Sequence, residues 1–292
     1  MRALLDEIAD ILERGNGLDE QSRVDTRREA RLLVAGVLDC APGDVSQRDA
    51  RALPHTQRDR IRSAAIRRAR GEPLAYCVGA AAFRHLVLAV DARVLIPRPE
   101  TEILVDEALR VAAARPGGIA VDIGTGSGAI ALALASEGRF DGVIATDVSA
   151  DALDVARANA TRLPPGSAPV EFRAGMDLGP IEGVLARVIV SNPPYISFDE
   201  ATALPASVRN WEPATALFAA NGGMARYDAL FAGAARCLEP GGWLVLEVDA
   251  RRAQFTMTRA VQTGYVGVRI VNDLSGRERV LVAQTPATAV AP

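Results

Sequence analysis

The spacing of hydrophobic residues changes once along the chain, near residue 82, and this change predicts two regions. Two sets of apolar residues before that point recur at helical spacing: Leu4, Ile8, Ile11 and Leu12, then Ala30, Leu33, Val34 and Val37. A third helix is indicated by the capping-box pattern of Thr56 and Asp59, and Gly71 and Pro73 favour its end. We therefore expect residues 1–82 to form a small helical domain.

The pattern after residue 82 is typical of strands, and from residue 99 onward strands alternate with helices. Residues 83–98 are expected to form a hairpin linker, and the prolines of "PRPETEILVDEAL" open a helix. The expected strands are 119–123, 143–147, 170–173, 188–191, 243–248, 265–271 and 279–283. Residues 99–292 are thus predicted to adopt an α/β fold, a doubly wound and mostly parallel sheet with helices on both faces. No helix separates the last two strands, so they should pair antiparallel.

Composition narrows the class of protein. The 292 residues are 49% hydrophobic and 24% charged, which is typical of a globular chain. The longest apolar stretch, "IAVDIGTGSGAIALALA", contains an aspartate and four glycines, so we expect neither a membrane span nor a signal peptide. Three widely spaced cysteines and two histidines predict no metal site and no disulfide framework, which suits a cytoplasmic protein. A net charge of −3 argues against stable nucleic-acid binding.

The first motif with chemical meaning is "VDIGTGSGAIALALA", in which a strand ends, a glycine-rich turn follows and a helix begins. Glycine there lets the backbone bend tightly and lets a ligand approach where a Cβ would collide. The turn is a weak signal alone. Gly124, Gly126 and Ala129 also satisfy the fingerprint of dinucleotide-binding enzymes, so a nicotinamide dehydrogenase stays open at this point.

The second motif is Asp147, which closes "GVIATD" about twenty residues after the glycine loop. A carboxylate at the end of a second strand can accept hydrogen bonds from both ribose hydroxyls of an adenosine. Capping of the next helix is the alternative role, but Ser149 and Asp151 already serve that purpose. The two motifs together predict an adenosine-containing cofactor.

The third motif is the corner "NPPY", residues 192–195, which directly follows a run of β-branched residues. Two prolines fix the backbone around Asn192 and Tyr195, which suits a binding site better than an ordinary loop. The strand before it should lie beside the strand that ends at the glycine loop, so the two motifs should face each other. The Asn192 carbonyl and a neighbouring backbone carbonyl are acceptors for a planar NH₂ group, and the Tyr195 ring offers a face for it.

"DIGTGSG", "ATDVS" and "NPPY" at these spacings resemble a class I S-adenosylmethionine-dependent methyltransferase of the amino-methylating kind, with its seven-stranded sheet. The stretches "GEPLAYCVG", "VLIPRPETE", "WEPATALFA", "NGGMARY" and "DLSGRERV" further resemble the HemK/PrmC family, the release factor glutamine N(5)-methyltransferases. The resemblance covers nearly the whole chain, and "IPRPETE" is its most specific element. Asp249 stands where the family usually has glycine.

The resemblance implies a substrate, a cofactor and a set of site residues. The substrate is the glutamine of the Gly-Gly-Gln loop in class I peptide chain release factors, and the first domain recognises it. The cofactor is S-adenosyl-L-methionine, bordered by Gly124, Thr125, Gly126, Ser127, Gly128, Asp147, Asp177, Leu178 and Asn192. The glutamine amide is gripped by Asn192, Pro193, Pro194 and Tyr195, of which Asn192, Pro193 and Tyr195 are the catalytic residues.

Other functions share parts of this pattern. A nucleic-acid amino-methyltransferase also uses an Asn-Pro-Pro-aromatic corner. A dehydrogenase would share the glycine loop but would leave "NPPY" unexplained. A non-enzymatic binding module should have lost some motif positions, and here every one is intact.

The third helix carries six arginines against one acid, Asp59: Arg58, Arg60, Arg62, Arg67, Arg68 and Arg70. A solvated helix face is the favoured interpretation, and a docking surface for an acidic partner is the alternative.

Overall fold

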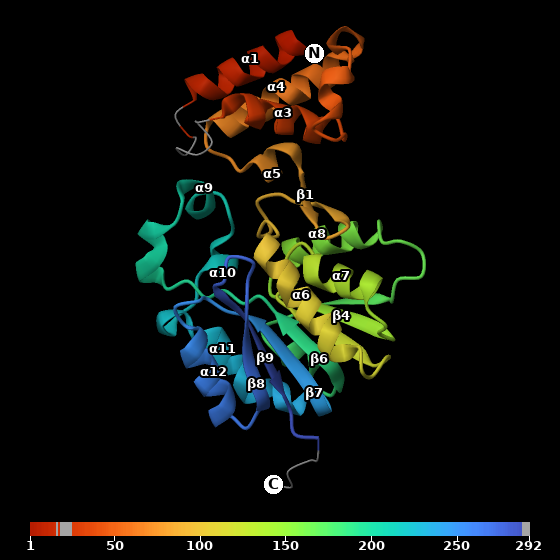
Figure 1. Ribbon diagram of the computed structural model, residues 1–292, viewed down its shortest axis with the longest axis vertical. Coiled ribbons are helices and arrows are strands. Elements are labelled where there is room, and N and C mark those ends of the chain that lie inside the picture. Colours follow the sequence, from red (N-terminus) through yellow and green to blue (C-terminus); the bar gives the residue numbers. More distant parts are fainter. Residues whose placement is uncertain (16, 18–24, 288–292) are drawn as a thin grey trace. The chain divides into compact units, whose positions relative to one another are not determined.

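The computed structural model describes residues 1–15, 17 and 25–287, which divide into two compact units (Figure 1). The first unit comprises residues 1–81, 90–92 and 202–212, and the second comprises 82–89, 93–201 and 213–292. The segment 202–212 therefore groups with the helical region, although its sequence lies in the middle of the strand-and-helix region.

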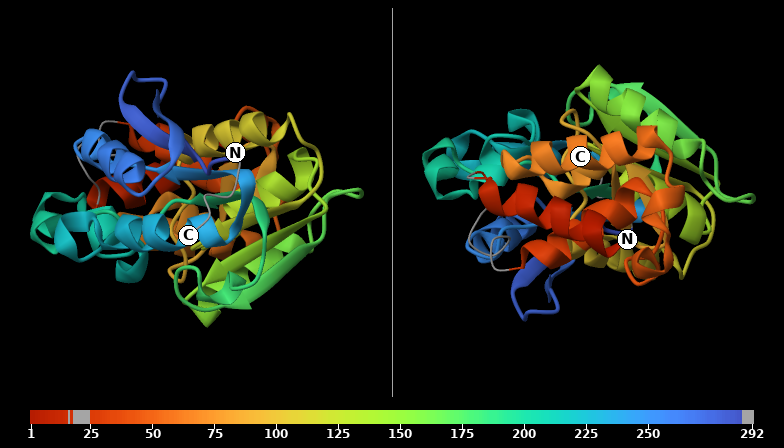
Figure 2. Two further views of the ribbon diagram at one scale, coloured as in Figure 1. Left: turned by 90° about the horizontal axis from the view of Figure 1, so that it is seen from below. Right: turned by 90° about the horizontal axis from the view of Figure 1, so that it is seen from above.

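The first unit is helical. Its helices are α1 (Arg2–Arg14), α3 (Thr26–Val37), α4 (His55–Ala69), α5 (Leu74–Val78) and α9 (Ala206–Arg209), with short 3-10 turns at Asp44–Gln47 and Ala50–Ala52. The apolar stripes of α1 and α3 pack together with α4 in one core, and Figure 2 (right) shows these red and orange helices side by side. The predicted capping box is wrong. Helix α4 begins at His55 after Pro54, so Thr56 lies inside the first turn, where it cannot cap.

Arginines of α4 hold the first unit together. Arg68 is only 5% exposed, and its Nε donates to Glu29 of α3 over 2.9 Å. Arg62 pairs with Glu7 of α1 at 2.6 Å, and Arg67 pairs with Glu72 after the helix. The solvated-face interpretation is therefore wrong for Arg68, because a buried guanidinium needs a partner and Glu29 supplies it.

Within the described residues, the second unit contains a seven-stranded sheet with the order β5-β4-β3-β6-β7-β9-β8. Its strands are β3 (Ile119–Ile123), β4 (Gly142–Asp147), β5 (Val170–Ala174), β6 (Ala186–Ser191), β7 (Leu238–Glu247), β8 (Val266–Asn272) and β9 (Glu278–Gln284). All seven predicted strands are confirmed, and β8 and β9 pair antiparallel as expected. Strand β6 lies beside β3. This confirms the prediction that the strand before the corner lies beside the strand before the glycine loop. A small hairpin, β1 (Ala80–Phe83) and β2 (Leu86–Ala89), precedes the sheet.

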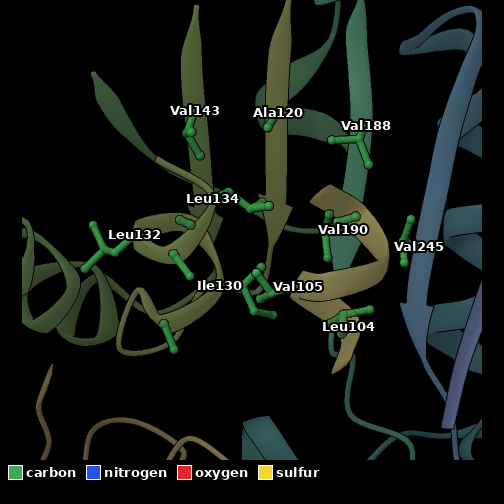
Figure 3. Close-up of a cluster of buried hydrophobic side chains, with 14 of the residues drawn as sticks. Leu104, Val105, Ala120, Ile130, Leu132, Leu134, Val143, Val188, Val190 and Val245 are labelled. Atoms are coloured by element: carbon green, nitrogen blue, oxygen red, sulfur yellow. The ribbon is translucent and has the colours of Figure 1, made fainter. Parts of the chain in front are cut away.

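Helices cover both faces of the sheet, so its strands bury successive side chains in two cores. On one face α6 (Pro99–Ala112) and α7 (Ala129–Glu137) pack on residues such as Ala120, Val188 and Val190 (Figure 3). On the other face α11 (Ala225–Gly233) and α12 (Ala253–Gln262) pack on the alternate residues, among them Val121 and Ile189. The remaining elements are α8 (Ala150–Ala160), α10 (Ala214–Leu217) and the 3-10 turns Gly179–Ile181, Phe198–Ala203, Asn221–Gly223 and Ala234–Arg236. Across the described ranges, no helix has both the length and the apolarity needed to cross a bilayer.

Candidate active site

The three sequence motifs converge on one hollow of about 860 Å³ in the second unit, partly open to solvent. It lies where β3, β4 and β6 end, because the parallel register sets Ile123 beside both Thr146 and Ser191. The hollow is lined by Arg93, Val94, Leu95, Ile123, Gly124, Gly126, Thr146, Asp147, Val148, Ser149, Ala152, Gly175, Met176, Asp177, Ser191, Asn192, Pro193, Pro194, Pro213, Thr215, Ala216, Arg226 and Leu230.

Some residues of the glycine loop line the hollow, and others shape the turn. Gly124 and Gly126 have φ angles of +77° and +55°, and a Cβ on either would meet nothing within 4 Å. A Cβ on Gly128 would instead lie 3.2 Å from the Ala156 Cβ, so this glycine allows α7 and α8 to approach. Thr125 and Ser127 are buried and do not line the hollow. Of the five predicted loop residues, the structure thus brings Gly124 and Gly126 to the hollow.

Asp122 supports the loop from beneath and was missed as a site residue. It is fully buried, and its Oδ2 accepts from Thr125 Oγ1 at 2.6 Å and from the Ala131 N–H at 3.1 Å. Burial raises the pKa of this carboxyl to about 7. Its Oδ1 has no hydrogen-bond partner among the described residues, although a buried carboxylate oxygen usually has one.

Asp147 is held in place by the backbone, with both oxygens accepting. Oδ2 accepts from the Gly126 N–H and Oδ1 from the Ser149 N–H, each at 2.9 Å. Ser149 caps α8 by accepting from the Ala152 N–H at 3.2 Å, so Asp147 does not serve as the cap. Each oxygen keeps a further lone pair. The carboxylate therefore fits a pair of ribose hydroxyls.

The two residues predicted near an adenine separate in the structure. Asp177 lines the hollow with a φ of +50°, and Arg226 donates to its Oδ2 at 3.0 Å. Leu178 does not line the hollow. It packs against the core on the α11 face, where its Cδ1 would lie 2.4 Å from a Cβ on Gly233.

The corner presents Asn192, Pro193 and Pro194 to the hollow. The Asn192 side chain donates from Nδ2 to Thr101 Oγ1 at 3.2 Å. Tyr195 does not line the hollow; its side chain packs against the core beneath the corner, and burial raises its pKa. Gly223 passes so close that a Cβ on it would lie 2.2 Å from the Tyr195 carbonyl oxygen.

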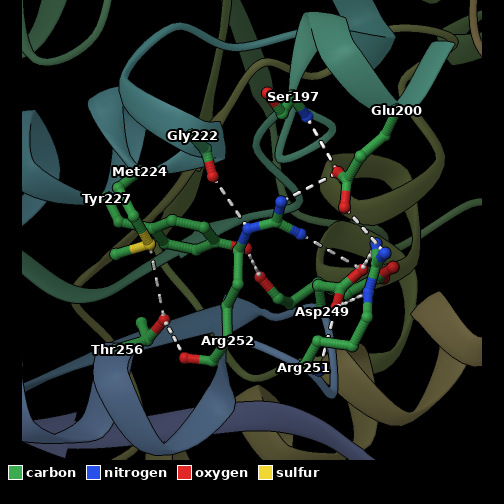
Figure 4. A network of polar contacts seen from close by, with 10 residues as sticks. Ser197, Glu200, Gly222, Met224, Tyr227, Asp249, Arg251, Arg252 and Thr256 are labelled. Carbon is green, nitrogen blue, oxygen red and sulfur yellow. Dashed lines mark hydrogen bonds and ion pairs between the residues drawn. The ribbon is translucent and has the colours of Figure 1, made fainter.

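A polar network ties the chain after the corner to the end of β7 (Figure 4). Glu200 accepts from the Ser197 N–H at 3.0 Å and pairs with Arg251 at 2.7 Å and with Arg252 at 2.8 Å. Asp249 completes the network by accepting from Arg251 at 2.8 Å. The aspartate that replaces the usual glycine is thus paired with arginines of this same chain.

Several lining residues were missed because they come from segments far apart in the sequence. Arg93 precedes the sheet, Arg226 opens α11, and Pro213 and Thr215 belong to the stretch "WEPATALFA". In the sequence that stretch shows only a resemblance to a family. No periodicity marks a residue that reaches a site from a distant segment of the chain.

Comparisons with known proteins show which families this chain resembles. The PrmC N-terminal domain model matches residues 16–79, and the methyltransferase small domain model matches residues 100–224. A release factor glutamine methyltransferase of Xylella fastidiosa (strain Temecula1) is 38% identical over 260 residues, 89% of this chain and 94% of that protein. A protein of the same name from Yersinia pestis is 42% identical over 224 residues, 77% of this chain and 79% of that protein.

Solved structures share the fold. The crystal structure of a methyltransferase from Pyrococcus furiosus has a TM-score of 0.52 at 21% identity and covers 79% of this chain and 98% of its own. The ribosomal protein L11 methylase of Lactobacillus delbrueckii subsp. bulgaricus has a TM-score of 0.50 at 18% identity, covering 71% and 99%. Both are class I methyltransferase folds, as predicted for this sheet.

Proposed function

The chain belongs to the release factor glutamine methyltransferase family, and from that premise we propose that it methylates the glutamine of the Gly-Gly-Gln motif in class I peptide chain release factors. It is an S-adenosylmethionine-dependent methyltransferase. One observation carries the choice of an amide substrate. The Asn192 corner lines the same hollow as Gly124, Gly126 and Asp147, so an NH₂ group at the corner lies within reach of a cofactor held by the loop.

The residues present fit S-adenosylmethionine. Gly124 and Gly126 leave open space where any other residue would place a Cβ, and Asp147 offers lone pairs suited to ribose hydroxyls. Where Asp122 is ionised, above its raised pKa of about 7, its carboxylate adds negative potential beneath the loop, which suits a cationic ligand. We assign Gly124, Gly126, Asp147 and Asp177 to the cofactor, which supplies an electrophilic methyl group when bound.

The Asn192 corner suits the difficulty of the substrate. An amide nitrogen is a weak nucleophile, because its lone pair is delocalised into the carbonyl. In our proposal Asn192 Oδ1 and the Pro193 carbonyl accept hydrogen bonds from the two N–H groups of the substrate amide. These hydrogen bonds fix the amide nitrogen and raise its electron density. Holding reacting atoms in line can contribute ~7–11 kcal/mol. A strong general base is then not required.

The proposal is tested by incubating a class I release factor with the enzyme and S-adenosylmethionine and mapping the product by mass spectrometry. We expect one added methyl group on the peptide that contains Gly-Gly-Gln, and none on a release factor whose motif glutamine is replaced by asparagine. Radiolabelled methyl transfer to RNA, measured in parallel, addresses the alternative substrate class. Label on RNA, or on another peptide alone, would contradict the proposal.

We further propose that the helical unit recognises the release factor. Arg62, Arg67 and Arg68 are unsuited to test this, because each is paired inside the unit. Arg60 and Arg70 are exposed. Arg60→Glu with Arg70→Glu should raise KM for the release factor, with less effect at high salt. Unchanged KM at low salt, equal to that of the control Arg236→Glu on the other unit, would leave these arginines without a docking role.

A further inference from the structure

The motif "IPRPETE" places Thr101 under the site. Helix α6 starts at Pro99, and Thr101 is its third residue, 5% exposed. Its Oγ1 donates to Glu247 Oε2 at 2.6 Å and accepts from Asn192 Nδ2 at 3.2 Å. Glu247 ends β7 and is 2% exposed. Ser191, the last residue of β6, pairs with Leu246 in the parallel register. Asn192 directly after β6 and Glu247 at the end of β7 each follow this paired position.

The order of donors in this chain of hydrogen bonds follows from one proton. A threonine hydroxyl has a single hydrogen and two lone pairs. When Glu247 is ionised it can only accept, so Thr101 gives it that hydrogen and offers Asn192 a lone pair alone. Asn192 must then turn its NH₂ group to Thr101, which leaves Oδ1 as the free end of its amide.

We propose that Thr101 and Glu247 are positioning residues that fix which end of the Asn192 amide faces the substrate. This inference rests on the proposed function, in which Oδ1 accepts an N–H from the glutamine amide. A reversed Asn192 would present its own NH₂ to the substrate's NH₂, two donors facing each other. The hydrogen-bonded chain Glu247–Thr101–Asn192 therefore selects a substrate that donates N–H bonds.

The surroundings of Glu247 make the hydrogen bonds among Glu247, Thr101 and Asn192 sensitive to pH. Burial raises the pKa of Glu247 to about 7. The titratable and charged groups around Glu247 are Arg98, Glu100, Tyr195, Tyr227 and Arg279. The two arginines favour the carboxylate, Glu100 opposes it, and both tyrosines stay neutral because burial raises their pKa. Below the pKa a protonated Glu247 can donate to Thr101, whose own hydrogen is then free to point at Asn192. Methyl transfer should therefore fall as pH drops through the neutral range.

Kinetics separate positioning from mere support of the fold. Thr101→Val keeps the shape and removes the hydroxyl; we expect a single-turnover rate about tenfold or more lower, roughly the loss of one strong hydrogen bond, with unchanged cofactor affinity. Thr101→Ser should recover most of the rate, and Glu247→Gln should flatten the pH profile. The matched control is Thr26→Val, because buried Thr26 also donates to a carboxylate, Glu13, at 2.9 Å. A normal rate in Thr101→Val, or equal losses in Thr101→Val and Thr101→Ser, would overturn the proposal.

A second measurement needs no substrate. In the ¹⁵N-labelled full chain, the side-chain NH₂ resonances of Asn192 are identified by their loss in Asn192→Asp. We expect them to shift with a midpoint near the Glu247 pKa of about 7, and to lose that titration in Thr101→Val and Glu247→Gln. A titration that survives in Thr101→Val would refute the proposed chain. If the linkage is seen but no release factor is methylated, the proposed function fails while the hydrogen-bonded chain stands.

Discussion

Asp147→Ala tests the cofactor assignment most directly. The carboxylate accepts from Gly126 and Ser149 at 2.9 Å each, and its remaining lone pairs are assigned to ribose hydroxyls. A hydrogen bond to a charged group contributes about 1.5–3 kcal/mol. At about 1.4 kcal/mol per tenfold change, Asp147→Ala should weaken S-adenosylmethionine binding about 10- to 150-fold. Isothermal titration calorimetry with the full chain measures the dissociation constant.

Two controls separate a lost contact from a damaged loop. Asp154→Ala removes an exposed carboxylate from α8, where it pairs with Arg157, and should leave cofactor affinity unchanged. Asp147→Asn keeps one acceptor, so its affinity should fall between those of the wild type and Asp147→Ala. A folded Asp147→Ala protein that binds within about twofold of the wild type, a difference of under half a kcal/mol, would refute the assignment.

Three further predictions follow from single contacts. Arg68→Ala should lower the free energy of unfolding by about 3 kcal/mol in urea titrations, because it removes a buried guanidinium and leaves the half-buried carboxylate of Glu29 unpaired, while Arg60→Ala should change it by under about 0.5 kcal/mol. Asn192→Ala should abolish most methyl transfer, and Asn192→Asp should retain little in single-turnover assays, since it sets an acceptor against the Thr101 lone pair. Gly223→Ala should lower both the melting temperature and the methyl transfer rate, because its φ is +88° and its Cβ would displace the corner.

The strands could be predicted from the sequence because each is a short apolar run bounded by turn residues, and the connections fix their neighbours. Asp147 and the corner could be placed as well, since both directly follow such strands and the ends of parallel strands share one edge. The start of α4 and the partners of its arginines were harder to predict. Its start depends on Pro54, and its arginines find partners on other helices, which no pattern within the helix reveals.

The direction in which a loop side chain points could not be predicted from the sequence. Leu178 and Asp177 are neighbours, yet only Asp177 lines the hollow, because Leu178 fills the space beside Gly233 on another element. Tyr195 was expected to offer its ring to the substrate. In the structure it packs under the corner, so its ring supports the loop from the core side.

The rigid corner after β6 and the hydrogen bonds that link Asn192, Thr101 and Glu247 have different roles in presenting Asn192. Pro193 and Pro194 fix the backbone, and the close pass of Gly223 limits its movement, so the position of Asn192 is set. A stiff backbone does not choose between the two ends of an asparagine amide. A half-turn about its last torsion exchanges oxygen and nitrogen with almost no change of shape, and that torsion is broad. The choice has to come from a neighbour with a defined hydrogen-bonding direction, and a threonine committed to a buried carboxylate is such a neighbour.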